Sequence, residues 1–123
     1  MNFVAVAFGG AAGALARYLC QLAMPPSASH WGATLTVNIL GSFIIGVMWA
    51  LSRSCMSPMW WLLLVTGFLG GFTTFSSFSL DAVRLFEQGQ ALRALLYVAA
   101  SVIFSLSACL SAVWLTQRFI KLS

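Results

Sequence analysis

Residues 67–78 read GFLGGFTTFSSF, and this stretch decides how the chain crosses a membrane. It lies inside a largely apolar segment that runs from about 59 to 83. Three glycines followed by paired threonines and paired serines make a poor helix centre, because glycine has low helix propensity and hydroxyls compete for backbone hydrogen bonds. At about 1.5 Å per residue, positions 70–73 lie roughly 17 to 21 Å from Met59, near the middle of a hydrocarbon core about 30 Å thick. The stretch therefore predicts a third transmembrane helix that is broken near the midplane.

A break at this depth has a chemical consequence. It frees backbone carbonyls, which a bilayer tolerates only where they are buried in protein or line a cavity. If two such breaks faced each other in a dimer, their oxygens could hold a hard cation. The alternative is a glycine-rich packing notch in an unbroken helix. Both interpretations stay open at this point.

The composition of the whole chain is that of an integral membrane protein. Of its 123 residues, 61% are hydrophobic and 7% are charged, and the mean hydropathy is +0.97. A soluble domain is roughly 25% charged. We therefore expect one all-α membrane domain over 1–123, with the first helix ended by Pro25 and Pro26. Its four transmembrane helices are expected at about 3–23, 31–51, 59–83 and 91–115.

Several classes of function are excluded by the same composition. The four helices leave no room for a separate soluble catalytic domain, and no nucleophile, metal cluster or phosphate loop suggests an enzyme. The net charge is +4, but the six basic residues are scattered singly and form no nucleic-acid patch. Three dispersed cysteines, Cys20, Cys55 and Cys109, suggest neither a disulfide framework nor a metal site. The composition therefore implies contact with membrane lipid.

Basic residues are balanced between the two predicted membrane faces. Three belong to the side of the N-terminus and three to the opposite side; in that order they are Arg53, Arg118 and Lys121, then Arg17, Arg84 and Arg93. Because orientation follows the bias in Lys and Arg, neither face is marked as cytoplasmic. The chain either inserts one way, with one charge discounted for depth, or inserts both ways. The second case permits an antiparallel homodimer whose two-fold axis lies in the membrane plane.

Polar side chains recur at one depth on three of the predicted helices. Thr34 and Asn38 share a face of the second helix, and Tyr97, Ser101 and Ser105 share a face of the fourth. Phe75 and Phe78 of the third helix lie at a similar depth. The hydroxyl and amide groups of the second and fourth helices together predict a polar track. A single Ser or Thr in such a place commonly bonds another helix or its own backbone, whereas the amide of Asn38 needs several partners.

Charged groups within the predicted helices are few. Arg17 is the only one well inside a segment, where it is either functional or able to extend to the interface. Asp81 and Glu87 lie at or beyond the end of the third segment, and no carboxylate lies in the other three. One function to consider is that of a small proton-coupled drug exporter. Such a protein needs a carboxylate embedded in the membrane. A non-conducting four-helix scaffold is a further alternative, against which the polar layer argues.

Three motifs then resemble those of one family. They are GGAAGALARY at 9–18, GATLTVNILGSF at 32–43 and GFLGGFTTFSSF at 67–78, in order and over essentially the whole chain. This pattern resembles the Fluc/CrcB fluoride channels. The resemblance implies an antiparallel, dual-topology dimer in the bacterial inner membrane, with two fluoride pathways and passive export that relieves fluoride toxicity. It also implies a central sodium ion held by backbone carbonyls.

The resemblance assigns roles to individual residues. Asn38 becomes an anion donor, Phe75 and Phe78 become pore-lining rings, and Arg17 takes a structural or vestibular role. The polar track is assigned to Thr34, Tyr97, Ser101 and Ser105, and the sodium ligands to the carbonyls of Gly70 and Thr73. Ser77 and Ala33 depart modestly from the family pattern without touching these positions.

The assigned groups suit a small, strongly hydrated anion. A pore must replace the water of fluoride with donors of similar strength, yet conduction requires binding weak enough for release. A ring of lysine or arginine would hold the ion too tightly. Neutral donors meet both needs: an amide, hydroxyls and the electropositive edges of phenylalanine rings. We therefore expect edge-on contacts from Phe75 and Phe78.

Overall fold

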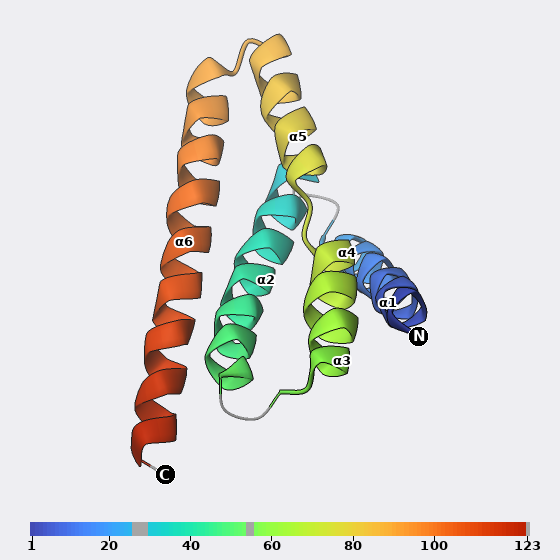
Figure 1. Cartoon of the computed structure of the whole chain (residues 1–123). Coiled ribbons are helices and arrows are strands. Elements are labelled where there is room, and N and C mark those ends of the chain that lie inside the picture. The colour runs from blue at the N-terminus through green and yellow to red at the C-terminus, as the bar shows by residue number, and fades with distance from the viewer. Residues whose placement is uncertain (26–29, 54–55, 123) are drawn as a thin grey trace.

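The computed structural model describes residues 1–25, 30–53 and 56–122, and within these ranges every regular element is helical (Figure 1). The elements along the chain are α1 (Asn2–Ala23), α2 (His30–Ser52), α3 (Pro58–Trp61), η1 (Leu62–Leu69), α4 (Gly70–Phe72), α5 (Phe75–Glu87) and α6 (Ala91–Leu122). Pro26 and Cys55 lie outside the described residues. Cys20 and Cys109 are both free thiols.

Among the described residues, four helical stretches are long and apolar enough to cross a membrane. They are Asn2–Ala23, His30–Ser52, Pro58–Glu87 and Ala91–Lys121. The predicted all-helical class with four candidate spans is therefore confirmed. The third and fourth stretches extend several residues beyond the ends predicted at 83 and 115. The predicted ends are set by hydropathy, which stops where the apolar residues stop. Helical hydrogen bonding continues through polar residues such as Arg84 and Arg118.

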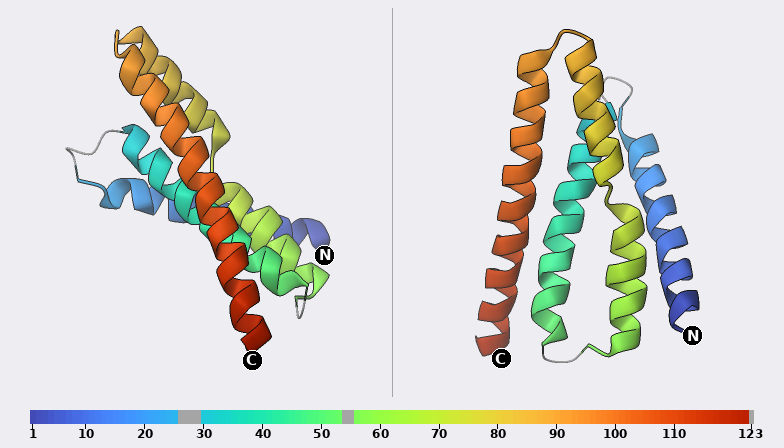
Figure 2. Two further views of the ribbon diagram at one scale, coloured as in Figure 1. Left: turned by 90° about the vertical axis from the view of Figure 1, so that its left-hand side faces the viewer. Right: turned by 45° about the horizontal axis from the view of Figure 1, so that its top comes forward.

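The third span is assembled from several pieces. Its first part runs through α3 and then η1, which is wound as a π-helix, into the short α4. Thr73 and Thr74 follow in extended conformation, with ψ angles of 157° and 115°. The chain then resumes as α5, and the link between α4 and α5 is visible in both views of Figure 2. We refer to Thr73 and Thr74 as the threonine link.

Glycines bring α1 against the first half of the third span. A Cβ atom added to the buried Gly9 or Gly13 would collide with the backbone carbonyls of Leu63 and Phe68. On the opposite side, a Cβ at Gly67 would lie 2.8 Å from the carbonyl oxygen of Val6. Small residues on both surfaces thus let the two backbones touch, as is common between membrane helices. The glycines before the threonine link therefore form a packing notch against α1, while the chain leaves helical conformation at the link itself.

The remaining core lies between α2, α5 and α6. Helices α2 and α6 run side by side over most of their length (Figures 1 and 2). They approach closely at Gly46, where an added Cβ would lie 2.5 Å from the carbonyl oxygen of Cys109. Val37 is completely buried, and Leu85, Ala94 and Tyr97 form a cluster between α5 and α6. These contacts fix the faces of the helices that surround the site described next.

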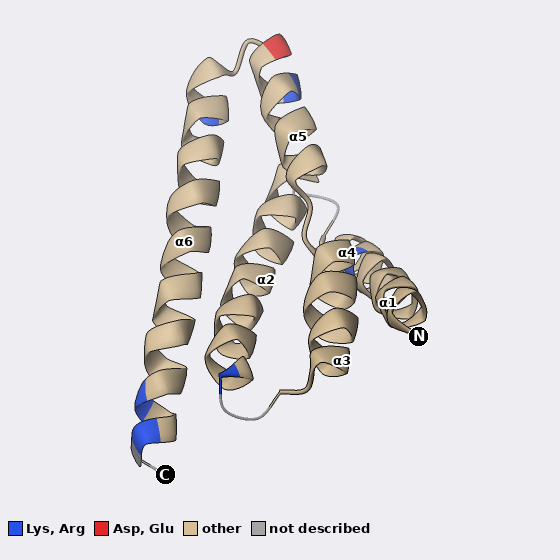
Figure 3. Ribbon diagram, in the orientation of Figure 1, with Lys and Arg blue, Asp and Glu red and all other residues tan. Residues whose placement is uncertain are grey.

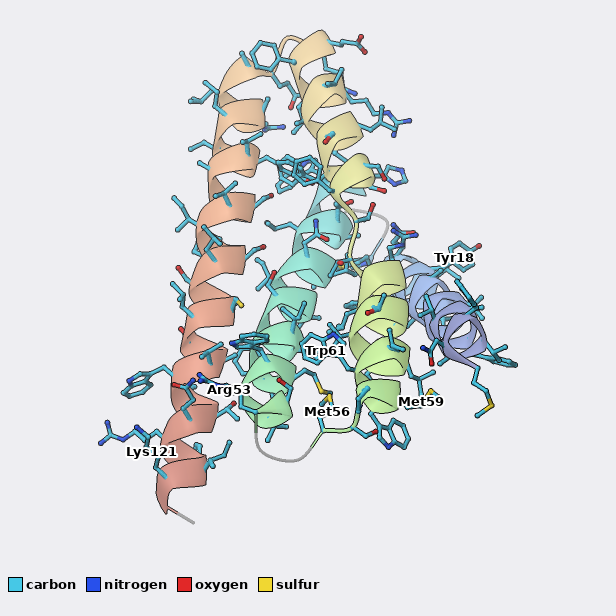
Figure 4. All side chains as sticks on the ribbon, viewed as in Figure 1. Tyr18, Arg53, Met56, Met59, Trp61 and Lys121 are labelled. Atoms are coloured by element: carbon cyan, nitrogen blue, oxygen red, sulfur yellow. The ribbon has the colours of Figure 1, made fainter. Side chains whose placement is uncertain are left out.

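Lysine and arginine occupy both ends of the helical bundle. Figure 3 shows them near the turn between α5 and α6 and again near the end of α6. Figure 4 places Arg53 and Lys121 toward the same end, where α2 also finishes. The turn between α5 and α6 uses Gly89 at a φ of 73°, a conformation that glycine adopts without strain.

Candidate functional site

A cavity of about 480 Å³ lies between α2, α6 and both halves of the third span. Residues that the sequence assigned to the fluoride pathway and to the sodium site meet here: Asn38, Gly70, Thr73, Phe75, Phe78, Ser101 and Ser105 line its wall. The Phe75 ring is 79% exposed and marks an open side. Seven of the ten assigned residues thus line one cavity.

Asn38 is bonded to the backbone of the threonine link. Its Nδ2 donates to the carbonyl oxygen of Thr74 at 3.0 Å, and its Oδ1 accepts from the amide of Thr74 at 2.8 Å. The side-chain amide therefore replaces the helical partners that an extended residue lacks. An asparagine amide carries two N–H donors, so one N–H remains for a ligand.

Thr74 also begins α5. Its Oγ1 accepts from the amide of Ser77 at 3.2 Å, as an N-cap residue does. The same oxygen lies 3.1 Å from the Ser77 hydroxyl and 3.2 Å from the Ser76 hydroxyl. The Thr73 hydroxyl instead donates back to the carbonyl of Leu69 at 2.8 Å. Threonine hydroxyls thus hydrogen-bond to backbone groups at the end of α4 and at the start of α5.

These bonds release two carbonyl oxygens. In a continuous α-helix the amide of Thr74 would bond to the carbonyl of Gly70, and the amide of Ser77 to that of Thr73. Both amides are diverted, the first to Asn38 and the second to the Thr74 hydroxyl. Backbone carbonyls freed in this way are ligands that a hard cation accepts. The chemistry of the link is therefore compatible with a bound sodium ion.

Aromatic rings form a continuous row beside the cavity. The ring centroids of Phe75 and Phe78 are 5.3 Å apart, and those of Phe78 and Tyr97 are 5.4 Å apart. Trp31 continues the row, with its centroid 5.7 Å from that of Tyr97 in an edge-to-face arrangement. Tilted rings present electropositive edges as well as faces. The row runs from the threonine link to the first turn of α2.

Two buried hydroxyls have no hydrogen-bond partner in good geometry among the described residues, although that of Tyr97 lies near those of Thr34 and Ser101. They belong to Tyr97 and Ser101, whose side chains are 3% and 7% exposed. A buried hydroxyl without a partner costs free energy, so such groups usually bind water or a ligand. Ser105, one turn further along α6, is half-buried and lines the cavity. The face of α6 predicted to be polar thus offers unused donors.

Asp81 is the residue that the sequence interpretation missed. We expected it at the end of the third segment, with the embedded region free of carboxylates; the structure instead buries it within α5, at 7% exposure. The Thr34 hydroxyl lies 2.7 Å from Asp81 Oδ2 and donates to it. A helical repeat could have found this, because Asp81 follows Phe78 by three residues and precedes Leu85 by four. It therefore shares their inward face.

Three of the assigned residues, Thr34, Tyr97 and Arg17, are not among those that line the cavity. Thr34 is buried beside Asp81, so its single proton is already engaged. Arg17 is half-buried on α1, which packs against η1 and α4 and contributes no residue to the cavity. The structure therefore separates Arg17 from the polar residues, while Thr34 and Tyr97 extend the site toward the start of α2.

Comparison with known proteins places the chain in a family. The family model described as CrcB-like protein, Camphor Resistance (CrcB), matches residues 4–113. A protein of Saccharophagus degradans named fluoride-specific ion channel FluC is 44% identical over 121 residues, covering 96% of this chain and 91% of that protein.

Two further proteins of the same name show comparable similarity. The one from Rhizobium johnstonii is 50% identical, covering 88% of this chain and 90% of its own length. The one from Leptospira interrogans is 40% identical, covering 97% and 100%. With matches of this extent and four candidate spans, the chain belongs to the CrcB family and is a multi-pass bacterial membrane protein.

Proposed function

We propose that this protein is a fluoride-selective channel that lets fluoride leave the cytoplasm passively and so relieves its toxicity. The observation that carries the proposal is the cavity at the threonine link, which gathers an amide, hydroxyls and phenylalanine rings without any lysine or arginine among its lining residues. The relatives named fluoride-specific ion channel support the same activity. The protein is not an enzyme in this account.

The donors of the cavity match the chemistry of the anion. The free N–H of Asn38 and the unpartnered hydroxyls of Tyr97 and Ser101 can replace water around fluoride. All are neutral, so the ion is bound without being trapped by a fixed positive charge. The edges of Phe75 and Phe78 provide weaker electropositive contacts along the same route. We expect a path from Tyr97 past the two rings toward Asn38.

A second copy of the chain completes the path. Phe75 is largely exposed, and the cavity is open beside it, so one chain alone does not enclose an ion. An antiparallel partner related by a two-fold axis in the membrane plane would cover this face and give two pores per dimer. The even division of basic residues between the two ends supports insertion in both orientations.

We place the threonine link near the membrane midplane, at the centre of this dimer. There the released carbonyls of Gly70 and Thr73 would hold a structural sodium ion together with those of the partner chain. The ion would neutralise the converging carbonyl dipoles of the two chains. The hydrogen bonds between Asn38 and the Thr74 backbone do not depend on this ion, since the two residues bond directly to each other.

The exporter alternative deserves a test because Asp81 is buried after all. Relatives of this chain are named channels, which is why we do not propose proton coupling. Purified protein in liposomes loaded with potassium fluoride should release fluoride when potassium can follow, at equal pH on both sides. Release that occurs only with a proton gradient would contradict the proposed channel.

A further inference from the structure

Trp31 shares a helix face with two residues of the proposed path. It precedes Thr34 by three residues and Asn38 by seven, so all three lie on one side of α2. Thr34 points to Asp81, and Asn38 points to Thr74, which shows that this side faces the protein interior. At about 1.5 Å per residue, Trp31 lies roughly 10 Å from Asn38 along the helix.

The surroundings of Trp31 differ from those of tryptophans that only anchor a helix end. Trp49, Trp60 and Trp114 are 52%, 56% and 58% exposed, as expected for rings among lipid headgroups. Trp31 is partly buried and packs against the cluster of Leu85, Ala94 and Tyr97. Its ring contacts Tyr97 edge to face and extends the aromatic row to the end of the bundle. Anchoring alone does not explain this inward position.

The indole N–H of Trp31 is an unused donor within the described structure. No described residue accepts a hydrogen bond from it, and the indole can only donate. Deeper along the row lie the unpartnered hydroxyls of Tyr97 and Ser101. The N-terminal end of α2 also carries the positive pole of the helix dipole, which favours an anion. Neutral donors therefore continue from the cavity to Trp31, past the Asp81 carboxylate, which accepts the hydrogen bond of Thr34.

We propose that Trp31 is a further anion-contacting residue, whose indole N–H gives fluoride its first protein donor at the end of the path where α2 begins. This inference rests on the proposed channel function. A tryptophan N–H is a neutral donor, so it offers the ion a replacement for one water molecule without the strong hold of a basic group. Phe78 and Tyr97 then receive the ion further in.

The inference is tested first by transport. Trp31→Phe keeps an aromatic ring beside Tyr97 and removes the N–H donor. Loss of one hydrogen bond to an ion is expected to lower fluoride flux in liposomes about ten-fold or more. Trp60→Phe, at a lipid-exposed tryptophan, is the matched control and should leave the flux unchanged. Equal flux for Trp31→Phe and the wild type would overturn the role of Trp31.

Binding is tested separately on the wild-type protein. In detergent, the indole ¹⁵N–¹H resonance that Trp31→Phe removes belongs to Trp31, and it should move on addition of fluoride but not of chloride. The other indole resonances of Trp31→Phe must match those of the wild type for this assignment, and a stationary Trp31 resonance then overturns the inference. If the wild type passes no fluoride, the proposed channel function fails. If the wild type conducts but neither the flux of Trp31→Phe nor the Trp31 resonance responds, only the inference about Trp31 fails.

Discussion

The two halves of the third span are built for different tasks. Before the threonine link, glycines of η1 and α4 lie against glycines of α1, and backbone meets backbone there. After the link, α5 carries Phe75, Phe78 and Asp81 toward α2 and α6, where amide and hydroxyl groups meet. The first half holds the bundle together by close approach. The second half supplies the groups that we propose to meet the ion.

The comparison also explains why one stretch of sequence supported two interpretations. Gly67 and Gly71 have the small size that a packing notch requires, and α1 occupies that notch. Thr73 and Thr74 have the hydroxyls that an interrupted helix requires, and both hydroxyls form backbone hydrogen bonds. Packing and local chemistry thus coexist within a few residues. Substitutions in the two halves should therefore fail in different ways.

The largest effect is expected for Asn38→Ala. This change removes both hydrogen bonds to the Thr74 backbone together with the remaining donor in the cavity. Backbone groups left unpaired inside a membrane cost several kcal/mol, so the variant should lose thermal stability. Its fluoride flux should fall about a hundred-fold or more. Liposome efflux and thermal unfolding in detergent measure the two losses. Normal flux would remove Asn38 from the path.

The next effect concerns the packing half. Gly13→Val places a branched side chain against the backbone of Phe68 and Phe72, which should destabilise the fold by about 3 kcal/mol. Ala12→Val, at the neighbouring exposed position, is the matched control and should change stability by less than about 0.5 kcal/mol. Denaturation in detergent compares the variants. If Gly13→Val were as stable as Ala12→Val, the close approach of α1 would be contradicted.

Phe75→Ile should separate transport from folding. Because the ring is largely exposed in one chain, stability should change little, whereas loss of its electropositive edge should lower fluoride flux about ten-fold. Phe104→Ile provides the control, since Phe104 is also exposed but does not line the cavity. Efflux per folded protein is the measurement. Equal flux in both variants would exclude Phe75 from the pathway.

The smallest effect is expected for Ser105→Ala. It removes one neutral hydroxyl from the cavity wall, which should lower fluoride flux about three-fold, as for a single modest hydrogen bond. Ser107→Ala, two residues along α6 and outside the cavity lining, should have no effect. If Ser107→Ala changed the flux and Ser105→Ala did not, the proposed path would not run along the face of α6 that carries Ser105.

Much of this arrangement could be predicted because it depends on local patterns. Apolar length fixed the four candidate spans, and the repeat of Tyr97, Ser101 and Ser105 identified the inward face of α6. Asp81 was misjudged because hydropathy treats a carboxylate as the end of a segment. In the structure, α5 continues and Thr34 supplies the hydrogen bond that permits burial.

Other features depend on distant partners. The bond between Asn38 and Thr74 joins residues 36 positions apart, and no local pattern specifies it. The π-helical winding of η1 was likewise not expected. The inward position of Trp31 was also missed, because a tryptophan at a segment end is typical of an interface anchor. For Asn38 and Trp31 the contact with another helix decides the outcome.

The central claim is that neutral donors around the threonine link conduct fluoride in preference to chloride. The most direct test is the ionic current through the purified protein in a planar bilayer, recorded with fluoride and then with chloride in the same membrane. We predict a steady fluoride current without a proton gradient and no measurable current after replacement by chloride. Comparable currents for the two anions, or none for fluoride, would contradict this account.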